Sequence, residues 1–230
     1  MILAFCNFAQ SFPSAPMNVL FKLRISEVIG PVSADLLAPD EPKAVMTLAH
    51  GAGADKDHPF MTALSNELFR HNIATLRFNF PFMERKKGRP DAPAVAQKTI
   101  EIAVKKAAEL FPSAPLFVAG KSFGGRMSSQ FVSMSKPKNV KGIIFYGFPL
   151  HPAGEPGTER ADHLKNVKIP MLFLQGTHDA LAEWSLIEKT TKELPTSMLI
   201  KIEGADHSFK KGKEDLIPML ADLTAQFIFK

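Results

Sequence analysis

The sequence predicts an α/β fold in which helices cover both faces of a mostly parallel β-sheet. Short apolar runs alternate along the chain with longer segments of helical periodicity, which is the pattern of repeated strand–helix units. Several runs, such as 140–146 (VKGIIFY), are apolar at consecutive positions rather than at every second one, as expected of strands buried on both faces. At 230 residues, one such sheet fits a single domain.

Two leading strands, at 19–25 and 32–37, are expected to form a hairpin that turns near Gly30 at an antiparallel edge of the sheet. In the first predicted helix, Phe60, Leu64 and Leu68 recur at helical spacing. The remaining strands are expected at 44–48, 75–80, 140–146, 169–175 and 197–202, with one more running into Gly120. The expected helices span 59–70, 94–110, 126–134, 182–194 and 216–229, and the segments 82–93 and 147–158 are expected to be loops.

The composition argues against several classes of function. The net charge of +5 is mild and the basic residues are spread out, so no nucleic-acid partner is expected. The one dense basic cluster, at 85–89, is interpreted as a solvated loop, with a rim that attracts anionic substrates as the alternative. No apolar run approaches the ~20 residues of a membrane span, so no membrane partner is expected.

The N-terminal segment and the single cysteine bear on processing and location. Residues 1–16 carry no basic n-region and are interrupted by polar residues and proline, so they are interpreted as a loose extension ahead of a single domain at 17–230. Cys6 is the only cysteine, which excludes an internal disulfide and fits a reducing compartment. We therefore expect a cytoplasmic protein and leave its oligomeric state open.

The segment 116–126 (LFVAGKSFGGR) organises the rest of the interpretation. An apolar strand runs into Gly-x-Ser-x-Gly-Gly and a helical pattern follows, which is typical of a nucleophile elbow with Ser122 at its apex. Gly120-Lys121-Ser122 also matches the end of a P-loop, but Pro115 stands where that motif needs its first glycine. A chance Gly-x-Ser-x-Gly is the other alternative, and the partners further along the chain decide against it.

A serine nucleophile needs a base to take its proton and a third group to orient that base. Ser122 is followed by Asp179 and then by His207, the order of serine, acid and histidine seen in hydrolase sheets, and each follows a predicted strand. Asp206 is a weaker candidate for the acid, because neighbouring residues tend to point apart. His178 is a weaker candidate for the base, because it directly precedes the predicted acid.

The tetrahedral intermediate of acyl transfer needs two donors for its oxyanion. The backbone N–H of Phe123 is expected to supply one, and the glycine-rich loop 50–53 after the strand at 44–48 is expected to supply the other through Ala52. Candidates for the substrate-lining walls are His50, Phe82 and Trp184, together with the neighbours Pro81 and Met83, although each could equally be ordinary packing. The other histidines show no metal-ligand spacing, so no metal or cofactor is expected.

Six motifs carry a resemblance to a known family: GKSFGGR, LAHGAGAD, LRFNFPF, YGFPLHPAG, LQGTHD and EGADHSF. From about Val45 to the C-terminus, the chain resembles the α/β-hydrolase superfamily. It is most similar to a small branch with the testis-expressed hydrolase-like protein and the hydrolase-like subunit of the NSL complex, and more distantly to dienelactone hydrolases. The resemblance implies an eight-stranded core, little or no lid, and a triad at Ser122, Asp179 and His207. One departure is Pro81-Phe82, where related chains often carry Arg-Gly.

The expected function is a serine hydrolase of the carboxylesterase kind, acting on a small-molecule ester, thioester or related acyl substrate. Two alternatives stay open at this point. One is a hydrolase-shaped binding or scaffold protein, and the other is a dienelactone-type or C–C bond hydrolase that uses the same three residues. The substrate itself is not specified by the motifs, because a fold does not determine what its site accepts.

Overall fold

The computed structural model describes residues 17–230, so the extension expected at 1–16 lies outside the described residues. Its centre is an eight-stranded sheet with the order β1-β2-β4-β3-β5-β6-β7-β8. The strands are β1 (Met17–Ser26), β2 (Gly30–Ala38), β3 (Ala44–Ala49), β4 (Ile73–Phe78), β5 (Leu116–Lys121), β6 (Val140–Tyr146), β7 (Met171–Gly176) and β8 (Ser197–Ile202). As predicted, β1 and β2 form the antiparallel edge. The other strands, β3 to β8, run parallel to one another.

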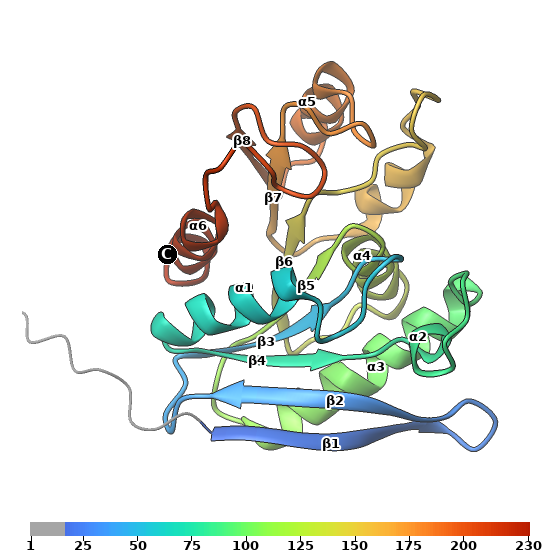
Figure 1. Cartoon of the computed structure of the whole chain (residues 1–230), viewed down its shortest axis with the longest axis vertical. Coiled ribbons are helices and arrows are strands. Elements are labelled where there is room, and N and C mark those ends of the chain that lie inside the picture. Colours follow the sequence, from blue (N-terminus) through green and yellow to red (C-terminus); the bar gives the residue numbers. More distant parts are fainter. Residues whose placement is uncertain (1–16) are drawn as a thin grey trace, which may run out of the picture.

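Helices cover the sheet on both faces, which confirms the predicted α/β class (Figure 1). One face packs on Leu64 and Leu68 of the first helix and Leu220 of the last, and the other packs on Ile100 and Phe131 of two central helices. The helices are α1 (Pro59–Arg70), α2 (Pro81–Glu84), α3 (Pro93–Leu110), α4 (Phe123–Ser135), the 3-10 helix η1 (Glu159–Asn166), α5 (Trp184–Lys192) and α6 (Ile217–Ile228). Within the described residues, no helix is both long and apolar enough to cross a membrane.

Two short helices occupy segments for which no helix was predicted. Pro81–Glu84 forms one helical turn where a loop was expected, because Pro81 supplies a preset helical φ at the first position. The Glu84 carboxylate then anchors the end of that turn on the β1–β2 hairpin, accepting hydrogen bonds from the backbone N–H of Ser33 at 3.1 Å and from Lys22 Nζ at 2.5 Å. The 3-10 helix η1 follows the irregular segment 147–158 and leads into β7.

The parallel register brings the ends of the central strands to one edge. Lys121 at the end of β5 pairs with Tyr146 at the end of β6, and Gly176 at the end of β7 pairs with Ile202 at the end of β8. Ligands of open α/β sheets bind beyond the carboxyl ends of such strands. The loops that follow β3, β5, β7 and β8 leave the sheet there, and they carry the residues singled out from the sequence.

Candidate active site

Ser122 occupies a sharp turn between β5 and α4 with a backbone conformation that serine rarely adopts. Its φ is 51° and its ψ is −116°, a strained region tolerated only where the surrounding structure enforces it. Glycines make the turn possible. A Cβ at Gly120 would lie 2.3 Å from the backbone N of Gly125, and a Cβ at Gly124 would lie 2.3 Å from the carbonyl oxygen of Ala49. The motif therefore forms the strand–turn–helix that its glycines predicted.

The structure brings Ser122, His207 and Asp179 into one hydrogen-bonded chain. His207 Nε2 lies 2.8 Å from Ser122 Oγ, and His207 Nδ1 lies 2.7 Å from Asp179 Oδ2. Since the Asp179 carboxylate only accepts, Nδ1–H is the donor and Nε2 is left to accept the serine proton. This is the tautomer that a general base next to a serine requires.

Asp179 is buried and held by two further donors. Gln175 Nε2 donates to Asp179 Oδ2 over 2.6 Å, and the backbone N–H of Leu181 donates to Asp179 Oδ1 over 2.8 Å. Gln175 is itself fixed, because its Oε1 accepts from the backbone N–H of Phe148 at 2.8 Å. Sequence reasoning missed Gln175, although a polar residue at the end of the otherwise apolar β7 was a signal for it.

The two alternative residues, Asp206 and His178, do not join this chain. Asp206 Oδ1 accepts from the backbone N–H groups of Ser208 and Lys210, both at 2.8 Å, so the carboxylate caps its own loop. The side chain of His178 is exposed, while its backbone N–H bonds to the carbonyl of Ala205 at 3.0 Å. Of the candidates, Asp179 and His207 are the two that the structure joins to Ser122 by hydrogen bonds.

The glycine-rich loop 50–53 lies directly against the serine. A Cβ at Gly51 would be 3.7 Å from Ser122 Cβ, and Ala52 next to it is exposed. Phe123, the other expected backbone donor, is the first residue of α4. The N–H groups of a first helical turn have no partner within the helix, so they can bind an anion.

His50 holds this loop in place from the inside. Its ring is fully buried, Nδ1 donates to the carbonyl of Gly51 at 2.7 Å, and Nε2 accepts from the backbone N–H of Phe80 at 3.0 Å. Burial lowers the pKa of His50 to about 4, so the ring is neutral at physiological pH. Both ring nitrogens are occupied, so His50 has no free polar atom to offer a substrate, and its buried ring fits the packing alternative that the sequence left open.

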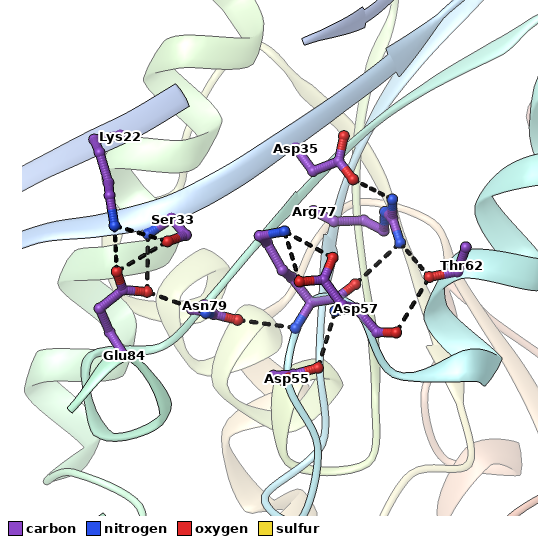
Figure 2. Close-up of polar contacts among 10 residues, drawn as sticks. Lys22, Ser33, Asp35, Asp55, Asp57, Thr62, Arg77, Asn79 and Glu84 are labelled. Atoms are coloured by element: carbon purple, nitrogen blue, oxygen red, sulfur yellow. Dashed lines mark hydrogen bonds and ion pairs between the residues drawn. The ribbon is translucent and has the colours of Figure 1, made fainter. Parts of the chain in front are cut away.

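A polar network fixes Lys56, which lies between the glycine-rich loop and the start of α1 (Figure 2). Arg77 of β4 donates through Nη1 to the carbonyl of Lys56 at 3.0 Å and to Thr62 Oγ1 at 2.7 Å, and through Nη2 to the buried carboxylate of Asp35 on β2. Asn79 Oδ1 accepts from the backbone N–H of Lys56 at 2.9 Å. Sequence reasoning did not foresee this network, although a charged residue within each of two apolar strands pointed to buried pairing.

The remaining wall candidates differ in where they lie. Phe82 is almost fully buried and stands edge-on to Phe123, with ring centroids 6.0 Å apart, so its ring packs against the first residue of α4. Trp184 is half-buried at the start of α5, with Lys201 Nζ 5.4 Å from its ring centroid. The basic segment 85–89 is exposed throughout, as expected of a solvated loop. Among residues 17–230, no group of three or more His, Cys, Asp and Glu side chains could hold a metal ion.

Comparison with known proteins gives this architecture a family. The chain matches the family model of an alpha/beta hydrolase domain over residues 42–225. Among solved structures, it is similar to a dienelactone hydrolase from Anabaena variabilis, with a TM-score of 0.77, 18% identity, and coverage of 94% of this chain and 98% of that one. It is also similar to a serine hydrolase without a lid from Xanthomonas campestris, with a TM-score of 0.72, 19% identity, and coverage of 94% and 97%. A third similar structure is an alpha-beta serine hydrolase homologue from Coxiella burnetii, with a TM-score of 0.73, 19% identity, and coverage of 95% of this chain and 100% of that one. The match to the family model covers most of the sequence, and the chain therefore belongs to the α/β-hydrolase family.

Proposed function

We propose that this protein is a serine hydrolase of the carboxylesterase kind, acting on a small-molecule ester, thioester or related acyl compound. The observation that carries the proposal is the hydrogen-bonded chain from Ser122 Oγ through His207 to Asp179, built on a serine with φ 51°. Strained backbone at a nucleophile is a feature that folding alone does not favour, since it costs stability.

In the proposed reaction, His207 Nε2 accepts the Ser122 proton as Oγ attacks the carbonyl carbon of the substrate. Asp179 stabilises the imidazolium that forms and keeps its ring in place. The imidazolium then gives its proton to the leaving group, and an acyl group remains on Ser122. In the second half, water attacks that ester, His207 takes a proton from the water, and Ser122 leaves with the proton restored.

The negative charge of each tetrahedral intermediate falls on the former carbonyl oxygen. We assign its stabilisation to the backbone N–H groups of Phe123 and Ala52, as the sequence predicted. The position of Phe123 at the first turn of α4 supports this, because an unpaired helical N–H group and the helix dipole both favour an anion there. The closeness of Gly51 to Ser122 supports the second donor, because a Cβ at Gly51 would lie only 3.7 Å from Ser122 Cβ and Ala52 is the next residue.

Three finer assignments stay proposals. We place the chain in the small branch that the six sequence motifs resemble, in a cytoplasmic setting suggested by the single cysteine, and as one domain over residues 17–230. The short connection formed by 147–158 and η1 favours small or extended acyl groups that need no large cap to enclose them.

A fluorophosphonate probe tests the proposal directly, because it forms a covalent adduct only with an activated serine. Wild-type protein, Ser122→Ala and the control Ser113→Ala are incubated with the probe and weighed as intact proteins. Ser113 is an exposed serine in the turn before β5. The expected result is one adduct on the wild type and on Ser113→Ala, and none on Ser122→Ala.

The same three proteins are then assayed with p-nitrophenyl esters, thioesters and lactones of increasing length. Turnover by the wild type that disappears in Ser122→Ala supports the proposal and begins to define the substrate. A folded wild type that carries no adduct and turns over none of these compounds would contradict the proposal and favour a binding or scaffold protein.

A further inference from the structure

Lys121, the last residue of β5, extends its side chain past Gly51 toward the loop that carries His207. Its Nζ donates to the backbone carbonyl of His207 over 2.6 Å. This contact links two residues that are 86 positions apart in the chain. In the sequence analysis, Lys121 was considered only as part of a P-loop match, and the proposed reaction assigns it no role.

The lysine shares a small volume with the two partners of the serine. A Cβ at Gly147 would lie 3.3 Å from Lys121 Nζ, 3.5 Å from Asp179 Oδ2 and 3.5 Å from His207 Nδ1. The φ of Gly147 is +71°, so this position suits glycine for its backbone as well as for its lack of a side chain. The three polar groups therefore crowd around one bare backbone position.

The charged and titratable groups near the ammonium come from two loops. Asp179 follows β7, while Asp206 and His207 follow β8, and both carboxylates attract the lysine charge. The centroid of the Phe209 ring lies 5.5 Å from Nζ.

We propose that Lys121 is a positioning residue of this hydrolase: its ammonium holds the backbone carbonyl of His207, and with it the imidazole, in place beside Ser122 and Asp179. The inference rests on the proposed function and adds a residue to it. One consequence follows: loss of the N–H donor lets the His207 loop drift away from Ser122.

Burial of the ammonium supports a role beyond packing. It lowers the pKa of Lys121 to about 8, with Asp179 and Asp206 opposing the shift, so the group is still largely protonated at pH 7. An apolar side chain of similar length would fill the same space without that cost. The chain keeps a charge where burial opposes it, next to the two partners of the serine.

Three substitutions separate the donor from the charge. Lys121→Met removes both, Lys121→Gln keeps an N–H donor but no charge, and Lys121→Arg keeps both. The control Lys141→Met changes an exposed lysine at the opposite end of the neighbouring strand β6. Each variant is measured for kcat and KM on the best ester substrate across pH 5–9, with near-UV circular dichroism and the melting temperature as checks of folding.

We expect Lys121→Met to lower kcat by about tenfold or more with little change in KM, because a displaced base slows the chemistry more than binding. Lys121→Arg, which keeps a charged donor, should restore most of the lost kcat, and Lys121→Gln, whose neutral donor is weaker, should restore less of it. Lys141→Met should match the wild type in every measurement.

An unchanged kcat in Lys121→Met would overturn the positioning argument, and equal kcat values in Lys121→Met, Lys121→Gln and Lys121→Arg would overturn the role of the N–H donor. If Lys121→Met fails to fold, the comparison of Lys121→Gln with Lys121→Arg still decides the role of the charge. These outcomes differ from failure of the proposed function, in which the wild type itself shows neither adduct nor turnover.

Discussion

Acidification should destabilise this protein through His50. The folded chain holds this ring buried and neutral between Gly51 and Phe80, and burial lowers its pKa from 6.5 to about 4. The unfolded chain exposes the ring, which then takes a proton below about pH 6.5. Between these two values the unfolded state binds more protons, so the free energy of unfolding falls as the pH falls through this window.

The size of the effect follows from the two pKa values. A difference of 2.5 pH units corresponds to about 3 kcal/mol when the pH is well below 4, and to about 2 kcal/mol at pH 5. Burial and the nearby charge of Arg126 also lower the pKa of His163 to about 4, so that residue adds to the loss in the same direction. A loss of this size is a large share of the 5–15 kcal/mol by which proteins are usually stable.

His50→Gln isolates the contribution of one ring. The glutamine amide can donate and accept as the imidazole does, but it takes no proton in this range. Wild type, His50→Gln and His163→Gln are unfolded in urea at pH 7, 6 and 5, and followed by the fluorescence of Trp184, the only tryptophan. From pH 7 to pH 5, His50→Gln should lose about 2 kcal/mol less than the wild type. Equal losses in the two proteins would show that the buried ring is not what makes the fold sensitive to acid.

Three further results are expected of the described contacts. Gly124→Ala should lower the free energy of unfolding by several kcal/mol, because its Cβ would lie 2.3 Å from the carbonyl oxygen of Ala49. A urea midpoint equal to that of the wild type would refute this close approach. Gln175→Glu should slow fluorophosphonate labelling by about tenfold or more, since it sets a second carboxylate against Asp179, and unchanged labelling would show that the amide is dispensable. Tyr146→Phe should lower the free energy of unfolding by about 1 kcal/mol, because the lost hydroxyl forms a 2.8 Å hydrogen bond with Thr224 Oγ1 of α6. Turnover should not change, since this bond lies outside the site, and altered turnover would contradict the prediction.

The sequence predicted those parts of the molecule that local patterns determine. The order of strands and helices followed from the alternation of apolar runs, and the helix predicted at 59–70 has those same bounds in the structure. The candidate triad could be proposed because each of its residues lies in the turn or loop that follows a strand, and strands that end at one edge bring such residues together. Chain order and strand ends picked out three residues that the structure joins by hydrogen bonds, although 57 and 28 residues separate them in sequence.

The supporting contacts could not be predicted in the same way, because each joins residues that no local pattern relates. The Arg77 side chain reaches an aspartate 42 positions earlier, and Lys121 reaches a carbonyl 86 positions later. The sequence marked such residues as unusual, as polar groups within or at the end of apolar strands, but it could not say which partner each would find. His50 illustrates the risk: its place beside the nucleophile suggested a site wall, and only the two occupied ring nitrogens show that it braces the loop.

This division bears on how the site is built. Ser122 directly follows β5 and the glycine-rich loop directly follows β3, and these two strands are neighbours whose spacing the sheet fixes. Asp179 and His207, in contrast, lie on loops that leave β7 and β8, where backbone hydrogen bonds of the sheet no longer hold them. Residues whose contacts were not predicted stand where that support ends. Gln175 binds the Asp179 carboxylate, Lys121 binds the His207 carbonyl, and His50 binds the loop beside the serine. Polar residues at the ends of strands therefore hold the loops of the candidate site in the positions that its hydrogen bonds require.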